Sequence, residues 1–266
     1  MGIDPHAELL EEWGLPDSAA GLDAFGKAVI DAAVGQVSII KPQVSFFERH
    51  GSRGFAVLEE LCMRASQAKL LVIMDAKRGD IGTTMQAYFD AWLGQQAPFL
   101  CDALTVNPYL GFESLKPILA QAVERGKGLF VLAATSNPEG AELQQSVGAN
   151  GLTVAANVWD GLAQVNNLVA GAGERLGNFG AVVGATVNPN RYGLGNLTSF
   201  VQPVATPILS PGFGAQGARL LDAGRLFGAS AHSVIANVSR SVLQAGPSAV
   251  MDAIAQAKAE LAEGLA

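Results

Sequence analysis

Short apolar runs alternate with amphipathic stretches along the whole chain. Runs such as residues 69–74 and 128–134 predict strands buried on both faces. Longer stretches with apolar residues three or four apart, such as 55–68 and 154–173, predict helices. About eight such strand–helix alternations predict an α/β fold with a parallel sheet, and they favour a closed (β/α)8 TIM barrel over an open doubly wound sheet.

The same pattern predicts the limits of the domain. No linker, repeat or break in composition divides the chain, so residues 1–266 are expected to form a single barrel domain. Only three residues precede Asp4, so the first strand is expected to be nearly absent or truncated. Asp17 is the expected N-cap of a helix, and residues 225–230 are the expected final strand. No GxGxxG motif follows the first strand, which disfavours a dinucleotide-binding fold.

Composition and charge narrow the class of function. The 266 residues are 49% hydrophobic and 15% charged, which is typical of a globular protein. The formal net charge of −7 disfavours bulk binding to nucleic acid or to anionic membranes. The two cysteines have no metal-ligand spacing. The chain opens without a signal segment and has no apolar run that spans a bilayer, so a cytoplasmic location is expected.

Charged residues follow one buried strand at unusual density. Asp75, Lys77, Arg78 and Asp80 come directly after the apolar run KLLVIM. Residues two apart in a strand point to the same side, so Asp75 and Lys77 are expected to project together if the strand extends that far. Taken alone, such a run is more often a solvated strand end than an active site.

Other polar groups fall at the carboxyl ends of further predicted strands, where (β/α)8 barrels carry their active sites. The glycine-rich loop at residues 210–217 can direct backbone N–H groups toward an anion. Arg240 follows the last strand, in a region where such barrels often bind phosphate. The remaining strand-end candidates are Asp4, Lys41, Asn107 and Ser136.

Several of these segments together resemble one family. DAKRGDI matches the Asp-x-Lys-x-x-Asp pattern of orotidine 5′-monophosphate decarboxylases. The segments GIDP, IIKPQ, TVNPYLG, LAATSNPEG and SPGFGAQG resemble the bacterial branch of that family with longer chains. The matches occur in order from Gly2 to about Pro247, so they are more specific than any single motif.

This resemblance implies an activity and a set of roles. The family converts orotidine 5′-monophosphate (OMP) to UMP without a metal or organic cofactor, and its members are homodimers with sites at the interface. By resemblance, Lys77 donates a proton to pyrimidine C6, Asp75 lies beside the departing carboxylate, and Lys41 belongs to the same charge network. Asp80 and Thr84 are expected to reach the neighbouring subunit's site.

The resemblance also assigns the residues that bind the rest of the substrate. Asp4 matches the ribose-binding aspartate, and Ser136 matches the serine that contacts the pyrimidine edge. Gln216 and Arg240 match the residues on the phosphate side. The segment around Arg240 is less typical of the family than the central motifs.

Two other functions remain open from the sequence. Magnesium-dependent sugar-phosphate decarboxylases and synthases of the same superfamily share the Asp-x-Lys-x-x-Asp strand, but they carry an acidic metal ligand where this chain has Lys41. A non-catalytic barrel that binds a nucleotide or a partner protein is the second alternative. Retention of Lys41, Asp75, Lys77 and Asp80 together argues against it, because buried charges without a use are costly.

Overall fold

The computed structural model describes residues 1–195, 197 and 203–266. Its eight strands form one sheet in which they follow one another in sequence order, and the paired registers are parallel. The strands are β1 (Gly2–Ile3), β2 (Ile39–Pro42), β3 (Leu71–Arg78), β4 (Ala103–Val106), β5 (Gly128–Ala134), β6 (Phe179–Val183), β7 (Ile208–Ser210) and β8 (Val234–Ala236). The predicted parallel α/β fold, with the strand order of a (β/α)8 barrel, is confirmed.

Helices connect the strands throughout the described part of the chain. The α-helices are α1 (Ala7–Glu12), α2 (Ala19–Ala33), α3 (Ser45–Glu48), α4 (Gly51–Gln67), α5 (Gly82–Leu93), α6 (Lys116–Glu124), α7 (Gly140–Gln144), α8 (Val154–Val169), α10 (Ala223–Phe227), α11 (Arg240–Leu243) and α12 (Val250–Gly264). Short 3₁₀ helices are η1 (Phe112–Leu115), η2 (Pro189–Tyr192), η3 (Leu220–Asp222) and η4 (Gly228–Ser233). None of the described helices has both the length and the apolar character needed to cross a membrane.

The chain divides into two compact units, and each contains separate stretches of sequence. Unit 1 comprises Met1–Ala76, Phe89–Leu104 and Val238–Glu260. Unit 2 comprises Lys77–Tyr88, Thr105–Asn237 and Leu261–Ala266. The expectation of a single domain over residues 1–266 stays a prediction.

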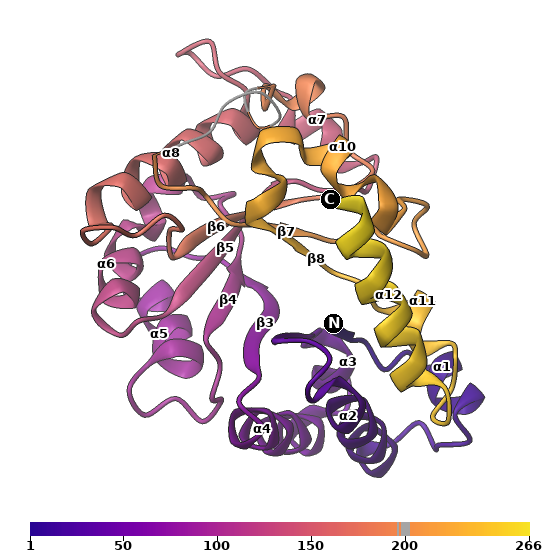
Figure 1. Cartoon of the computed structure of the whole chain (residues 1–266). Helices are drawn as coiled ribbons and strands as arrows, with labels where there is room; N and C mark the ends of the chain where they lie inside the picture. Colours follow the sequence, from indigo (N-terminus) through magenta and orange to yellow (C-terminus); the bar gives the residue numbers. More distant parts are fainter. Residues whose placement is uncertain (196, 198–202) are drawn as a thin grey trace. The chain divides into compact units, whose positions relative to one another are not determined.

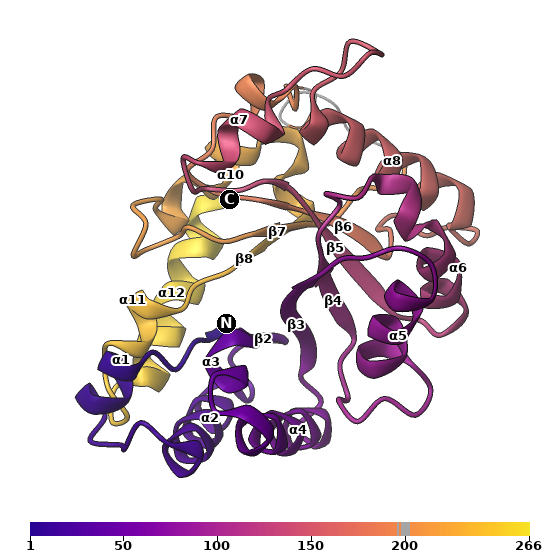
Figure 2. The same cartoon turned by 180° about the vertical axis from the view of Figure 1, so that it is seen from behind.

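Unit 1 is built on the pairing of β1 with β2 and of β2 with β3. Although β1 has two residues, Gly2 pairs with Lys41 and its N–H donates to the carbonyl of Val238 at 2.7 Å, so the short strand is held on both sides. Helices α2 and α4 lie side by side (Figure 1) and approach closely at Gly26, where an added Cβ would lie 2.2 Å from Leu61. Helix α1 lies beside α11 in both views (Figures 1 and 2), and Trp13 Nε1 donates to the carbonyl of Leu243 at 2.9 Å.

Unit 2 contains the pairings of β5 with β6, β6 with β7 and β7 with β8. Every residue of β6 is buried, and α8 packs against β5 and β6 (Figure 1). The buried Asn166 of α8 accepts from the N–H of Phe179 at 3.1 Å and donates to its carbonyl at 2.7 Å, which satisfies the backbone at the start of β6. The end of α12 also packs closely, since a Cβ added to Gly224 would lie 2.6 Å from the carbonyl oxygen of Gly264.

Two sequence expectations about local structure are wrong. Residues 225–230 belong to α10 and η4, and the final strand is the following Val234–Ala236. The apolar run was too short to separate strand from helix by its pattern alone. The N-cap of α2 is Ser18, whose hydroxyl accepts from the N–H of Gly21, because the carboxylate of Asp17 binds Arg49 instead.

Candidate active site

The ion pair between Lys41 and Asp75 is the central polar feature of unit 1. Lys41 lies near the end of β2 and Asp75 in the middle of the adjacent parallel strand β3, and Lys41 Nζ lies 2.8 Å from Asp75 Oδ2. The side chains are 6% and 11% exposed, respectively. Each of these buried charges compensates the other, because burying a charge without an opposite charge nearby strongly destabilises the folded protein.

The electrostatics of Lys41 follow from this environment. Burial acts to lower the pKa of the Lys41 ammonium, but the carboxylates of Asp75 and Asp4, with the hydrogen bond to Asp75, outweigh it and raise the pKa overall. Lys41 is therefore a fixed cation at neutral pH. Its charge is available to orient neighbouring carboxylates and ligand hydroxyls.

Asp4 and Ser239 bring two buried oxygen atoms close to β1. In the described structure, Asp4 Oδ1 and Ser239 Oγ are buried and have no hydrogen-bond partner. An added Cβ on Gly2 would lie 2.8 Å from Ser239 Cβ and 3.3 Å from Asp4 Oδ2, so only glycine leaves this space open. Two buried oxygens without partners indicate a place where a ligand hydroxyl can bind.

Arg240 is exposed at the beginning of α11, in the same unit as Asp4. Burial lowers the pKa of the His6 imidazole most strongly; Asp4 opposes this shift and Arg240 adds to it. The charges of Asp4 and Arg240 thus both act on His6. A guanidinium in this position is suited to an anionic group of a ligand.

Lys77 of unit 2 has an unusual backbone conformation. Strand β3 extends through Lys77 to Arg78, so the condition for Asp75 and Lys77 to share a strand is met. However, Lys77 has φ = +49°, and its N–H donates to the hydroxyl of the buried Thr105 at 2.9 Å. A left-handed conformation costs a lysine about 1–2 kcal/mol, and residues held in this way cluster at functional sites.

The residues after β3 form a tight turn and the start of α5. Asp80 is half-buried and its carboxylate accepts from the N–H of Ile81 at 2.8 Å, while Thr84 is exposed in the first turn of α5. The turn packs against the end of β4, where the N–H of Asn107 donates to the carbonyl of Arg78 at 2.7 Å. An added Cβ on Gly79 would lie 2.5 Å from the carbonyl oxygen of Asn107, so this close approach requires glycine.

Ser136 is half-buried in the loop that follows β5. It lies against the end of β6, since an added Cβ on Gly184 would be 3.1 Å from Ser136 Cβ and 3.2 Å from Ser136 N. The N–H of Gly184 donates to the carbonyl of Ala134 at 2.8 Å. Two neighbouring strand ends therefore fix the backbone around this serine.

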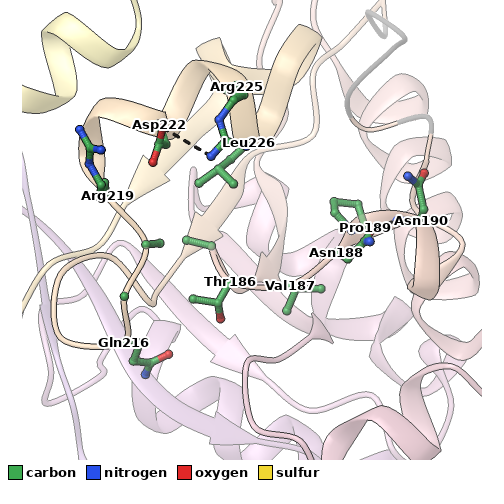
Figure 3. A pocket seen from close by; sticks show the side chains of 13 residues that line it. Thr186, Val187, Asn188, Pro189, Asn190, Gln216, Arg219, Asp222, Arg225 and Leu226 are labelled. Carbon is green, nitrogen blue, oxygen red and sulfur yellow. Dashed lines mark hydrogen bonds and ion pairs between the residues drawn. The ribbon is translucent and has the colours of Figure 1, made fainter.

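Gln216 lines a pocket of about 730 Å³ in unit 2 (Figure 3). The loop after β6 forms one wall and the segment from the β7 loop to α10 forms the other, where Asp222 and Arg225 pair at 3.4 Å. The lining residues are Ala185, Thr186, Val187, Asn188, Pro189, Asn190, Gln216, Gly217, Ala218, Arg219, Asp222, Arg225 and Leu226. Amides, a hydroxyl and two guanidinium groups make this pocket suited to a polar or anionic ligand.

Sequence reasoning missed several of these groups. Thr105 was hidden within an apolar strand, and the loop 186–190 carried no motif that marked it as a pocket wall. No motif marked Arg219 or Arg225 as a pocket residue, and Arg225 fell in the segment that was expected to be the final strand. The glycine-rich sequence beside Gln216 was the one signal that pointed to this region.

The candidate residues are distributed over both units. Unit 1 contains Asp4, Lys41, Asp75 and Arg240, and unit 2 contains Lys77, Asp80, Thr84, Ser136 and Gln216. Within the described part of the chain, no group of three or more His, Cys, Asp or Glu side chains is arranged to hold a metal ion. The parallel strand order defines an α/β-barrel protein, and the candidate residues lie in or after its strands, the region where such barrels carry their active sites.

Comparisons with known proteins define the family. Residues 2–254 match the model of the orotidine 5'-phosphate decarboxylase / HUMPS family, so the chain belongs to this family. It is 53% identical over 248 residues to the orotidine 5'-phosphate decarboxylase of Streptomyces coelicolor, covering 93% of this chain and 85% of that one. The corresponding enzyme of a Nocardioides species is 47% identical over 265 residues, 98% of this chain and 92% of that one.

Solved structures agree with the family assignment. A Streptomyces avermitilis protein assigned as an orotidine 5'-phosphate decarboxylase matches with a TM-score of 0.89 and 48% identity, over 99% of this chain and 90% of that one. The Leishmania donovani OMP decarboxylase matches with a TM-score of 0.71 and 28% identity, over 100% of this chain and 92% of that one. The magnesium-dependent alternative is not favoured, because the curated relatives described here are named as orotidine 5'-phosphate decarboxylases.

Proposed function

We propose that this protein decarboxylates OMP to UMP in de novo pyrimidine biosynthesis. The observation that carries the proposal is the 53% identity to a named orotidine 5'-phosphate decarboxylase over 93% of the chain. The buried Lys41–Asp75 pair supports it independently, because a rigid buried charge array suits a reaction that builds up negative charge.

Lys77 protonates the product carbanion in this proposal. Cleavage of the bond between C6 and the carboxylate releases CO₂ and leaves the electron pair on C6. No adjacent carbonyl can delocalise this charge as an ordinary enolate, so a cation must stabilise it. The Lys77 ammonium transfers a proton to C6, UMP results, and the neutral amine regains a proton from solvent.

The neighbouring charges orient this lysine. Asp75 lies beside the departing carboxylate, and a nearby carboxylate favours the ammonium form of a lysine. Lys41, held cationic by Asp75 and Asp4, fixes Asp75 and contacts the ribose. At an effective dielectric constant of about 20, unit charges 4 Å apart interact by about 4 kcal/mol, so an array of fixed charges contributes substantially to the rate.

The remaining candidates bind the parts of the substrate that do not react. Asp4, with its buried oxygen, accepts hydrogen bonds from the ribose hydroxyls. Ser136 contacts the pyrimidine edge, and Gln216 and Arg240 bind the phosphate. Binding energy from the remote phosphate orders the site around the reacting carbon.

A homodimer completes the proposed site, with Asp80 and Thr84 contributed to the neighbouring subunit. Three large apolar side chains of unit 2 support an interface, since Ile81, next to Asp80, and Tyr109 and Leu110, which follow β4, are 59%, 73% and 51% exposed. Exposed apolar side chains of this size often mark a contact surface. The protein is proposed to act in the cytoplasm and to bind neither nucleic acid nor membranes.

The test is the ultraviolet absorbance of OMP mixed with purified protein in the presence of EDTA. Loss of the substrate's absorbance with formation of UMP supports both the reaction and its independence of metal ions and organic cofactors. A folded protein that binds UMP but leaves OMP intact would support the non-catalytic alternative. Activity that returns only with magnesium would support the sugar-phosphate class.

A further inference from the structure

The loop that carries Ser136 is held by a side chain from outside the proposed site. Gln144, the last residue of α7, binds Thr135 twice. Its Oε1 accepts from the Thr135 N–H at 2.9 Å, and its Nε2 donates to the Thr135 hydroxyl oxygen at 2.8 Å. Both hydrogen bonds are partly buried, so water competes with them less than at an exposed position.

The hydrogen bonds continue along the loop on the far side of Ser136. The Thr135 hydroxyl donates to Asn137 Oδ1 at 2.7 Å, and Asn137 Nδ2 donates to Glu139 Oε2 at 3.3 Å. The residues immediately before and after Ser136 are thus joined through one hydroxyl group. Because Gln144 donates to that hydroxyl oxygen, the hydroxyl hydrogen is directed to Asn137.

The network leaves no room for a side chain at Gly140. An added Cβ on Gly140 would lie 2.8 Å from Thr135 Oγ1 and 3.1 Å from Gln144 Nε2. Gly184, which follows β6, approaches Ser136 itself, since an added Cβ there would lie 3.1 Å from Ser136 Cβ. Both this close approach and the hydrogen bonds of Gln144 restrict the loop that carries the serine.

We infer that Gln144 is a positioning residue that sets Ser136 for contact with the pyrimidine. This inference rests on the proposed function, because it takes the ligand of Ser136 to be the base of OMP or UMP. The amide of Gln144 suits both contacts, since its oxygen accepts from the N–H and its nitrogen donates to the hydroxyl oxygen of Thr135. Gln144 itself does not touch the substrate and acts only through Thr135.

The variants isolate this role. Gln144→Leu removes both hydrogen bonds with little change in volume, and Gln145→Leu makes the same substitution one residue further along as the matched control. Gln144→Glu keeps an acceptor for the Thr135 N–H and serves as the conservative variant, and it also tests the inference if the leucine variant does not fold. A displacement of about 1 Å at a site costs about 100-fold in rate, so Gln144→Leu is expected to lower kcat/KM for OMP by about 10- to 100-fold.

Ligand affinity separates positioning from general damage. Gln144→Leu is expected to weaken UMP binding by about 10-fold. Its affinity for ribose 5-phosphate, which lacks the base, is expected to stay within about two-fold of the wild-type affinity. For Gln145→Leu, kcat/KM for OMP and the affinities for UMP and ribose 5-phosphate are all expected to stay within about two-fold of the wild-type values. Gln144→Glu is expected to fall between Gln144→Leu and the wild type. Equal weakening of both ligands by Gln144→Leu would overturn the inference.

A double-mutant cycle with Ser136→Ala provides the second measurement. If Gln144 acts through Ser136, Gln144→Leu has little further effect on UMP affinity once the serine hydroxyl is gone. Effects that multiply in the double variant would overturn the positioning role. Wild-type protein that leaves OMP intact would contradict the proposed function instead, whereas normal turnover by Gln144→Leu would contradict only the role of Gln144.

Discussion

Lys41 Nζ and Asp75 Oδ2 are 2.8 Å apart in a buried ion pair, although the two residues are separated by 34 positions in the sequence. Parallel pairing of β2 and β3 brings the end of β2 beside the middle of β3 and so creates the pair. The bridge between Gln43 and Asp75, with the hydrogen bond from the Val44 N–H to the Asp75 carbonyl, extends this pairing past Lys41. The backbone thus fixes both charges before any ligand binds.

Removing one partner of this pair is expected to destabilise the protein more than removing both. Lys41→Met removes the ammonium that contacts the buried Asp75 carboxylate and is expected to lower the free energy of unfolding by about 3 kcal/mol. Lys41→Met combined with Asp75→Leu is expected to lose much less than the sum of the two single variants. Urea unfolding measures all three free energies, and strict additivity would contradict the pairing.

The pH dependence of stability should show the raised pKa of Lys41. The pKa of this lysine in the folded protein lies above the ordinary value of 10.5, so the contribution of its charge is fully present below pH 10.5 and is lost as the pH rises through the folded value. The difference in unfolding free energy between wild type and Lys41→Met is therefore expected to be constant at neutral pH and to shrink in strongly alkaline solution. A difference that grows with pH would contradict this assignment.

Substitution of Lys77 should separate activity from stability. Lys77→Ala is expected to abolish nearly all turnover while the far-ultraviolet circular dichroism stays unchanged, because the side chain is exposed. Lys77→Gly is expected to be equally inactive but more stable than Lys77→Ala by about 1 kcal/mol, because glycine adopts φ = +49° without strain. Near-normal turnover by either variant would exclude Lys77 as the proton donor.

Subunit mixing should show whether Asp80 acts on the partner's site. Asp80→Ala and Lys77→Ala are each expected to be nearly inactive, but a heterodimer of the two contains one site with both native residues. Random mixing in equal amounts makes about half of the dimers heterodimers with one intact site of two, so activity is expected to return to about a quarter of the wild-type value. Mixed dimers that remain inactive would show that the two residues act within one subunit.

The fold was predictable because burial and strand period leave clear patterns in the sequence. Apolar runs such as Gly128–Ala134 and Phe179–Val183 predict buried strands of a parallel sheet, because amphipathic helical stretches separate them regularly along the chain. The final strand was misplaced, because Val234–Ala236 is too short to carry a pattern of its own.

The candidate residues were predictable only as a list of strand ends. The Lys41–Asp75 pair follows from the parallel order of β2 and β3, which the sequence implied. The left-handed backbone of Lys77 and its hydrogen bond to Thr105 depend on tertiary contacts that no local pattern encodes. The hydrogen bonds of Gln144 to Thr135 were invisible for the same reason, since glutamine near a helix end carries no motif.

The interleaving of the two compact units has a consequence for synthesis on the ribosome. Residues 238–260 belong to unit 1 and residues 261–266 to unit 2, where Gly264 packs against Gly224. Each unit therefore includes residues that are synthesised late. We expect a nascent chain of this protein to complete neither unit until these residues are available, so its strands stay exposed for longer than in a protein whose domains fold one after the other.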